Sequence, residues 1–183
     1  MNTTEQQRKH KKKKQEAILA ANNRQLIAAA SEGNAQELAR LIPISDPTHQ
    51  ESAASAALAL WNATHKGHLE CIRLLLPFGG RGVTFSNVVA SLIFYEHCDV
   101  AKELLQTDDP HIDRKITGNA LFRAAHNPEM LALLIPFCGS KAENTPDHYN
   151  GLEEATMIGN AESVKLLLPV SDSHKVLTAF QEY

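Results

Sequence analysis

The stretch GHLECIRLLLP, from Gly67 to Pro77, returns almost unchanged as GNAESVKLLLP, from Gly159 to Pro169. Related segments are GNAQELARLIP at 33–43, EHCDVAKELLQ at 96–106 and NPEMLALLIP at 127–136. Their ends lie 34, 29, 30 and 33 residues apart. A repeat of this period is typical of arrays in which one supersecondary unit stacks on the next. The sequence therefore predicts about five tandem units.

Each unit is predicted to consist of two helices joined by a tight turn. The downstream helix carries bulky apolar residues at i, i+3 and i+4, which is the pattern of a helix with one buried side. The upstream helix carries paired small residues that let a neighbouring backbone approach closely. The downstream set is Leu38, Leu41, Ile42; Ile72, Leu75, Leu76; Val164, Leu167, Leu168. The small pairs are Ala29 and Ala30, Ala63 and Thr64, Ala124 and Ala125, Ala155 and Thr156.

Glycine marks the predicted turns, and proline marks the predicted ends of the second helices. Gly33, Gly67 and Gly159 stand where the chain reverses, and glycine tolerates the positive φ that such a turn needs. Glu96 replaces this glycine in the third unit, and the fourth unit lacks two residues, so we expect those two turns to be looser or rebuilt. Proline ends the second helix, because it cannot continue one without losing a hydrogen bond. These prolines are Pro43, Pro77, Pro136 and Pro169.

The layout resembles the ankyrin repeat, on the strength of the block at 67–76, its Gly-Asn counterparts at 33 and 159, and the small pairs upstream. The resemblance covers about residues 24–170 and implies an all-α, ankyrin-like helix-turn-helix solenoid with finger loops between the units. The Thr-Pro-Leu-His motif of the typical repeat is absent, and a tetratricopeptide-type solenoid is the alternative. Repeats ending Leu-Pro-x-Ser-Asp, as at Asp46 and Asp172, are similar to ankyrin arrays of amoeba-associated intracellular bacteria.

The charge is split along the chain. Residues 1–14 carry a net +5, whereas the remainder carries −8. We expect a basic tail at 1–14, a capping helix or linker at 15–23, the array at 24–170 and a tail or capping helix at 171–183. The basic cluster comprises Arg8, Lys9, Lys11, Lys12, Lys13 and Lys14.

Three interpretations of the basic cluster stay open. It is a solvated tail leading into a helix from about Gln15, a nuclear-import-like signal, or a contact for an anionic surface, either lipid or nucleic acid. The acidic body is not expected to bind nucleic acid, because phosphate neutralisation needs clustered Lys and Arg. The sequence also has no apolar run of the length that a membrane span requires.

The sequence shows no pattern of catalytic chemistry, and we expect no enzyme activity, metal or cofactor. Cys71, Cys98 and Cys138 lie in or beside apolar helical runs, which predicts buried reduced thiols. The spacing of His65 and His68 allows a metal site in principle, but the turn at Gly67 interrupts the helix and no third ligand is evident. We expect these histidines to be structural or exposed, with the His68 side chain bonding across the turn.

The implied function is a non-enzymatic protein–protein interaction module, with the partner bound by the inner helices and finger loops. Phe94 and Tyr95 stand where polar residues are usual, and either anchor a partner or fill the space left by the missing glycine. Trp61 is expected in the core. The alternative is a host-directed bacterial effector that uses the same surface. We expect a cytoplasmic or intracellular location, with nuclear location or delivery into a host cell as alternatives. The expected partner-binding residues are Asn62, His65, Lys66, Phe94, Tyr95, Arg123, Glu154 and Met157.

Overall fold

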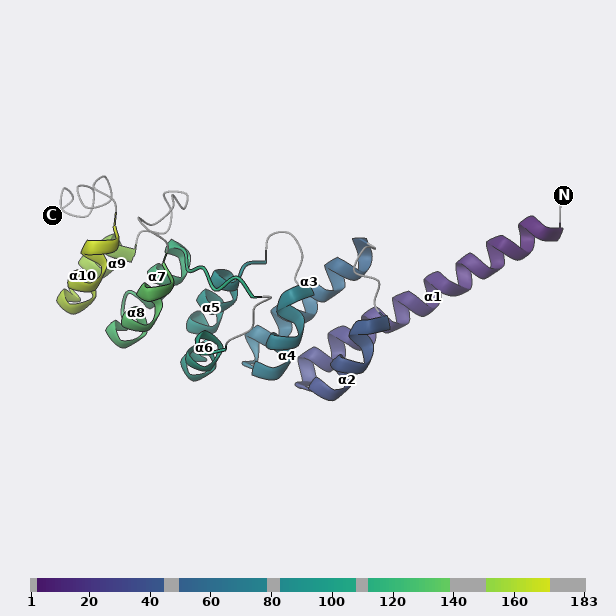
Figure 1. The fold of residues 1–183 in the computed structure, drawn as a ribbon, viewed down its shortest axis with the longest axis horizontal. Helices are drawn as coiled ribbons and strands as arrows, with labels where there is room; N and C mark the ends of the chain where they lie inside the picture. Colours follow the sequence, from purple (N-terminus) through teal and green to yellow (C-terminus); the bar gives the residue numbers. More distant parts are fainter. Residues whose placement is uncertain (1–2, 45–49, 79–82, 108–111, 139–150, 172–183) are drawn as a thin grey trace. The chain divides into compact units, whose positions relative to one another are not determined.

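The computed structural model describes residues 3–44, 50–78, 83–107, 112–138 and 151–171, and all of their regular structure is helical (Figure 1). The predicted all-α class is confirmed. The chain divides into two compact units, residues 1–82 and 83–183, which are described separately.

The first unit holds two helix–turn–helix pairs. The inner helices α1 and α3 pack on each other, and the outer helices α2 and α4 do the same. Each outer helix also packs on its own inner helix, so the two pairs form two layers. The elements are α1 (Thr3–Glu32), α2 (Ala35–Leu41), the 3-10 turn η1 (Ile42–Ile44), α3 (Gln50–His65), α4 (Leu69–Leu75) and the 3-10 turn η2 (Leu76–Phe78).

The second unit continues the same pattern with three pairs. The inner helices stack in the order α5, α7, α9, and the outer helices in the order α6, α8, α10. Among the described residues, each helix makes its main contacts with its pair mate and with its counterparts in adjacent pairs, which is the contact pattern of a repeat array. The elements are α5 (Phe85–Phe94), α6 (Cys98–Leu105), α7 (Gly118–Ala124), α8 (Pro128–Leu134), η3 (Ile135–Phe137), α9 (Gly151–Met157), α10 (Ala161–Leu167) and η4 (Leu168–Val170).

The turns between paired helices are built alike. Gly33, Gly67 and Gly159 have φ of 75°, 69° and 71°, as the sequence predicts. In the first turn the Gly33 N–H donates to the Ala30 carbonyl at 3.3 Å, and the Asn34 N–H donates to the Ala29 carbonyl at 2.9 Å. These two bonds make a Schellman ending, which satisfies carbonyls that the helix end would otherwise leave unpaired.

The third turn keeps this geometry without a glycine, so the expectation of a looser or rebuilt turn there is wrong. Glu96 itself takes φ of 64°. Its N–H donates to Ile93 at 3.1 Å, and the His97 N–H donates to Leu92 at 2.8 Å. The backbone bonds and the packing of the helices on either side hold Glu96 in a conformation that costs a non-glycine residue about 1–2 kcal/mol.

This strained residue gives a prediction in the stabilising direction. Glu96→Gly is expected to raise the free energy of unfolding of the second unit by about 0.5–1 kcal/mol, because glycine adopts this φ without a steric penalty and part of that gain is offset by chain entropy. Urea denaturation followed by circular dichroism measures it. A matched Glu103→Gly variant in the interior of α6 should lose about 1 kcal/mol. A loss of stability in both variants would show that the turn is not strained.

The fourth turn is rebuilt, as expected from its missing residues. It has no positive φ, and the Asn127 N–H donates to the Ala124 carbonyl at 2.8 Å. The Asn127 side chain then caps α8 by accepting from the Met130 N–H at 3.1 Å. Pro128 at the first position of α8 loses nothing there, because that N–H has no partner within the helix.

The core has the predicted composition. The paired small residues of α1, α3 and α7 are at most 4% exposed, and so are the first two bulky residues of α2 and α4. The third bulky residue of each stripe lies instead in the 3-10 turn that follows the helix, and Leu168 is 38% exposed. Proline explains these turns, because each stands second in a 3-10 turn just after the α-helix has ended.

The N-terminal segment differs from its prediction. Helix already begins at Thr3 and continues without a break to Glu32, so the predicted helix start near Gln15 is wrong. The Lys and Glu residues of this segment are good helix formers, and exposed ion pairs join Glu5 to Lys9 and Lys12 to Glu16 one turn apart. The first half-buried residue of α1 is Leu19, so the part before it extends beyond the packed pairs (Figure 1).

Side-chain bonds join neighbouring inner helices in the second unit where the Thr-Pro-Leu-His motif is missing. The buried Ser86 hydroxyl lies 2.8 Å from the Thr117 hydroxyl and accepts from the Thr117 N–H at 3.0 Å. Ile116 then forms an isolated parallel bridge with Cys138, with its N–H donating to the Phe137 carbonyl at 3.0 Å. The segment that precedes α7 is thus hydrogen-bonded to the chain at the end of η3. Most of the predicted fingers, at 45–49, 79–82, 108–111 and 139–150, lie outside the described residues.

Candidate partner-binding surface

In the first unit, α3 presents an exposed apolar stripe. Leu58 is 48% exposed and Trp61 is 52% exposed. The Trp61 ring stacks on the exposed His65 ring, with the centroids 5.5 Å apart and the planes 14° from parallel. The expectation that Trp61 belongs to the core is therefore wrong. Leu60 points into the core at 1% exposure, and the next residue along a helix is turned by about 100°, which directs Trp61 to the surface.

Two side chains that follow α3 contact Ser31, near the end of α1. The Lys66 ammonium donates to the Ser31 carbonyl at 2.9 Å and to the Ser31 hydroxyl at 3.1 Å. The Nε2 atom of His68 lies 3.3 Å from the same carbonyl. His68 is thus structural, as expected, while Asn62 is half-buried and His65 and Lys66 are exposed.

In the second unit, the predicted anchors at the end of α5 meet α7. Phe94 is 55% exposed and packs edge-on against the half-buried Tyr95 ring, with the centroids 5.1 Å apart. The Arg123 guanidinium of α7 lies over the Phe94 ring, 4.5 Å from its centroid. A cation over an aromatic face at this distance is attracted by the ring quadrupole. Of the two interpretations of Phe94, its exposure favours the anchor over a filler of the turn.

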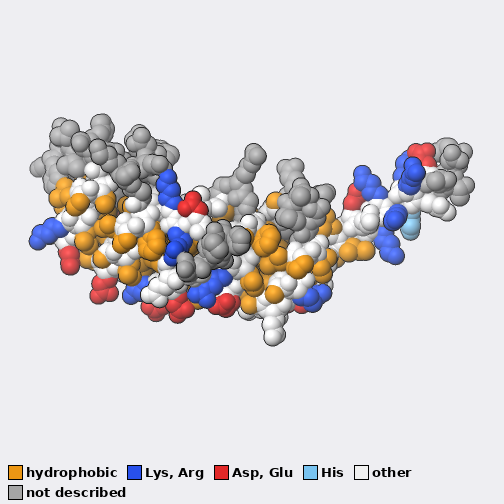
Figure 2. Space-filling model, in the orientation of Figure 1, with side chains coloured by type: hydrophobic (Ala, Val, Ile, Leu, Met, Phe, Trp, Pro, Cys, Tyr) orange, Lys and Arg blue, Asp and Glu red, His pale blue; other side chains and the backbone are white. Residues whose placement is uncertain are grey.

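The last inner helix adds a second apolar patch. Met157 is 54% exposed and Ile158 is 46% exposed at the end of α9, and Glu154 one turn earlier is half-buried. Exposed apolar side chains at the ends of inner helices thus recur in both units. Figure 2 shows hydrophobic side chains gathered on the face of the molecule that it presents.

The structure brings together only part of the predicted set. Asn62 and His65 lie in the last turns of α3 and Lys66 follows directly, and Phe94, Tyr95 and Arg123 form one cluster in the second unit. Leu58 and Trp61 were not among the partner-binding residues predicted from the sequence. The signal that would have found them was the register of the buried residues Ala59, Leu60 and Ala63, which leaves positions 58, 61, 62 and 65 on the outer side of α3.

The three cysteines are free thiols, and burial works against thiolate formation at two of them, Cys71 and Cys138. Cys71 is buried, and Cys98 and Cys138 are half-buried, so full burial is confirmed only for Cys71. Burial raises the pKa of Cys71, with the nearby Glu70 carboxylate adding to the effect. Burial also raises the pKa of Cys138 from 9.0 to about 11. A raised pKa leaves little thiolate at neutral pH, and the thiolate is the nucleophile.

The raised pKa of Cys138 predicts its reactivity. At pH 8 the native thiol is expected to react with iodoacetamide about 100-fold more slowly than in denatured protein, because a pKa two units higher leaves about 100-fold less thiolate. The same shift stabilises the folded state below about pH 9, and this stabilisation is lost as the pH rises through 11. Mass spectrometry of the Cys138 peptide measures the rate. Equal rates in native and denatured protein would contradict the shift.

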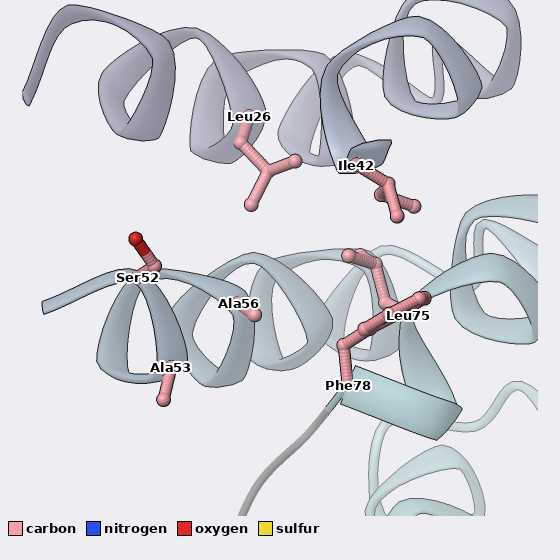
Figure 3. Close-up of a pocket in the computed structure, with 7 residues that line it drawn as sticks. All are labelled: Leu26, Ile42, Ser52, Ala53, Ala56, Leu75 and Phe78. Atoms are coloured by element: carbon pink, nitrogen blue, oxygen red, sulfur yellow. The ribbon is translucent and has the colours of Figure 1, made fainter. Parts of the chain in front are cut away.

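A small cavity lies between the two pairs of the first unit (Figure 3). Its volume of about 20 Å³ is close to that of one water, far below the several hundred Å³ of a typical small-molecule site. The Ser52 hydroxyl points toward α1 and, among the described residues, has no hydrogen-bond partner. The lining residues are Leu26, Ile42, Ser52, Ala53, Ala56, Leu75 and Phe78.

A more open hollow of about 490 Å³ runs along α1 beside η1. Ile18, 52% exposed, and Ile44, 48% exposed, form its apolar part, and Lys12 and Glu16 lie at its charged edge. In the described ranges, no three His, Cys, Asp or Glu side chains come together as metal ligands would. None of the described helices combines the length and the apolar character needed to cross a membrane.

Contacts and surface together define a class: an all-α protein of consecutive helix–turn–helix pairs with apolar and aromatic side chains exposed at the ends of its inner helices. Comparison with protein-family models, with curated proteins and with solved structures gives no significant match.

Proposed function

We propose that this protein is an ankyrin-like, non-enzymatic interaction module that binds a partner protein through the exposed ends of its inner helices. The observation that carries the proposal is the cluster of Phe94 and Tyr95 under the Arg123 guanidinium. The Phe94 side chain is 55% exposed, so more than half of its surface stays in water in the free protein. Its burial by a partner is favourable, by about 25 cal/mol for each Å² of apolar surface removed from water.

The chemistry of the cluster supports a protein partner. Aromatic residues and arginine dominate the energy of protein interfaces, where they fill pockets that exclude water. Arg123 is already held against the Phe94 face, so it loses little side-chain freedom when a partner arrives. The acidic charge of the chain outside residues 1–14 favours a partner with a basic surface, since complementary charge speeds association.

Two observations support a non-enzymatic role. The raised pKa of Cys71 and Cys138 works against a thiolate nucleophile. The cavity between the two pairs of the first unit is about the size of one water, and the larger hollow of about 490 Å³ along α1 is open and does not enclose a substrate. Trp61 stacked on His65 supplies a second exposed anchor of the same kind in the first unit.

The test is affinity capture by the full chain followed by binding measurements with each purified candidate. Phe94→Ala/Arg123→Ala is expected to weaken binding at least about 10-fold, because two central anchors at about 1 kcal/mol or more each together exceed the roughly 1.4 kcal/mol that corresponds to tenfold. The matched control is Leu133→Ala/Leu168→Ala, which removes apolar side chains 39% and 38% exposed outside the inner helices. Equal affinity in wild type and the Phe94/Arg123 variant would refute this site, and weakening by the control alone would move it to the outer helices.

A further inference from the structure

The projecting part of α1 presents positive charge around its circumference. All six basic residues of the cluster are exposed (Figure 2). Lys9 pairs with Glu5 at 3.1 Å and Lys12 with Glu16 at 3.8 Å. The remaining four, Arg8, Lys11, Lys13 and Lys14, have no carboxylate within ion-pair distance among the described residues.

The helical form decides where these charges point. At about 100° per residue, Arg8, Lys11 and Lys14 lie along one side of α1, and Lys9 and Lys13 lie on about the opposite side. A flat anionic surface reaches only one side of a helix. A groove with phosphates on both walls reaches both sides at once.

This arrangement of positive charges destabilises α1 when no ligand is bound. Like charges stand three or four residues apart at Arg8–Lys11, Arg8–Lys12 and Lys9–Lys13, and pairs at this spacing destabilise a helix. A polyanion that neutralises these charges removes this cost, so binding and helix formation support each other.

The geometry points to a second activity, in which residues 3–17 of α1 bind in the major groove of double-stranded DNA through the phosphates of both strands. That groove is about 12 Å wide, and an α-helix with its side chains is about 10–12 Å across. The contacts are to phosphates, so binding is independent of base sequence.

Other polyanions fit this helix less well. An interfacial membrane helix needs an apolar side, and between Thr3 and Ala17 no apolar residue is larger than alanine. Binding to single strands relies on aromatic stacking, and this segment has no aromatic residue apart from His10. The major groove of duplex RNA is too deep and narrow to admit a helix.

The acidic body does not prevent this contact. Leu19 is the first half-buried residue of α1. Along the axis, Arg8 lies about 16 Å, Lys11 about 12 Å and Lys14 about 8 Å before Leu19, at about 1.5 Å per residue. The first two distances exceed the screening length of about 8 Å at physiological ionic strength, so salt largely screens the repulsion from the body at Arg8 and Lys11, whereas Lys14 lies about one screening length away.

The test is fluorescence anisotropy of a labelled 20-base-pair duplex with the full chain between 50 and 200 mM NaCl. About five phosphate contacts predict a fall in affinity of about 500-fold over this range. Lys11→Gln/Lys14→Gln and Lys9→Gln/Lys13→Gln remove charge from opposite sides of α1. Each is expected to lose about 60-fold in affinity at 0.1 M salt, since each contact adds about eightfold there. The control Lys102→Gln/Lys165→Gln, which removes the same charge from the second unit, should change affinity less than about threefold.

Three outcomes would overturn the inference. One is a loss in only one of the two α1 variants, which indicates a flat surface instead of a groove. The second is an equal loss in the control, which indicates unspecific attraction to the whole chain. The third is equal or tighter binding to duplex RNA, to a single strand or to phosphatidylserine vesicles under the same conditions.

Discussion

Gly33→Val is expected to destabilise the first unit by about 2–5 kcal/mol, whereas the same change at Gly159 is expected to destabilise the second unit by about 1–2 kcal/mol. Both glycines have the positive φ of a Schellman turn, at 75° and 71°. Any L-residue there carries backbone strain of about 1–2 kcal/mol. The two positions differ in what surrounds them.

The extra cost at Gly33 comes from His68. A Cβ atom on Gly33 would lie 2.9 Å from the His68 Nδ1 atom, closer than Cβ atoms approach other atoms in real structures, and 3.0 Å from its Cε1 atom, which is a tight contact. The ring is also placed by its contact with the Ser31 carbonyl, so moving it breaks an existing arrangement. A Cβ atom on Gly159 meets nothing within 4 Å. Overpacking typically adds about 1–3 kcal/mol, which is the predicted difference between the two variants.

Chemical denaturation of both variants measures this difference, with hydrogen exchange of 24–41 and 151–168 to assign the loss to each unit. A double-mutant cycle isolates the cause. Adding His68→Ala should recover about 1–2 kcal/mol in Gly33→Val and none in Gly159→Val, because only the first pair is in contact. Equal destabilisation at the two glycines would mean that His68 does not pack against the first turn.

The sequence was sufficient to predict the features that depend on local chemistry. The glycine turns, the small residues between inner helices and the ends of α2, α4, α8 and α10 before proline follow from steric rules that act within a few residues. The third turn was mispredicted because packing overrode local preference. Glu96 takes a glycine conformation since the helices on either side of it are held by Leu92, Ile93 and Leu104, all at most 3% exposed.

The candidate surface was harder to predict, because exposure depends on helix register and not on residue type. A tryptophan is usually mostly buried, and this preference placed Trp61 in the core. The ends of helices were also difficult. Residues 1–14 were predicted to be a solvated basic tail, yet ion pairs one turn apart and strong helix formers extend α1 to Thr3.

The second large effect is expected in the middle of the second unit. Leu131→Ala should destabilise that unit by about 2–5 kcal/mol, because the fully buried side chain leaves a cavity as well as losing its transfer energy. Leu133→Ala on the same helix is the matched control, with a side chain 39% exposed and an expected loss of less than about 1 kcal/mol. Both changes remove the same atoms from α8, so the difference between them measures burial alone.

The set of helices that lose hydrogen-exchange protection in Leu131→Ala tests the stacked architecture. α8 packs on α6 and on α10 as well as on its own partner α7. In an array whose stability is the sum of each pair and its contacts with its neighbours, weakening the central pair uncouples both flanking pairs. Hydrogen exchange of Leu131→Ala should therefore show lower protection in α6 and α10 as well as in α8. If α8 alone lost protection, the flanking pairs would be stable by themselves and the second unit would not fold as a stack.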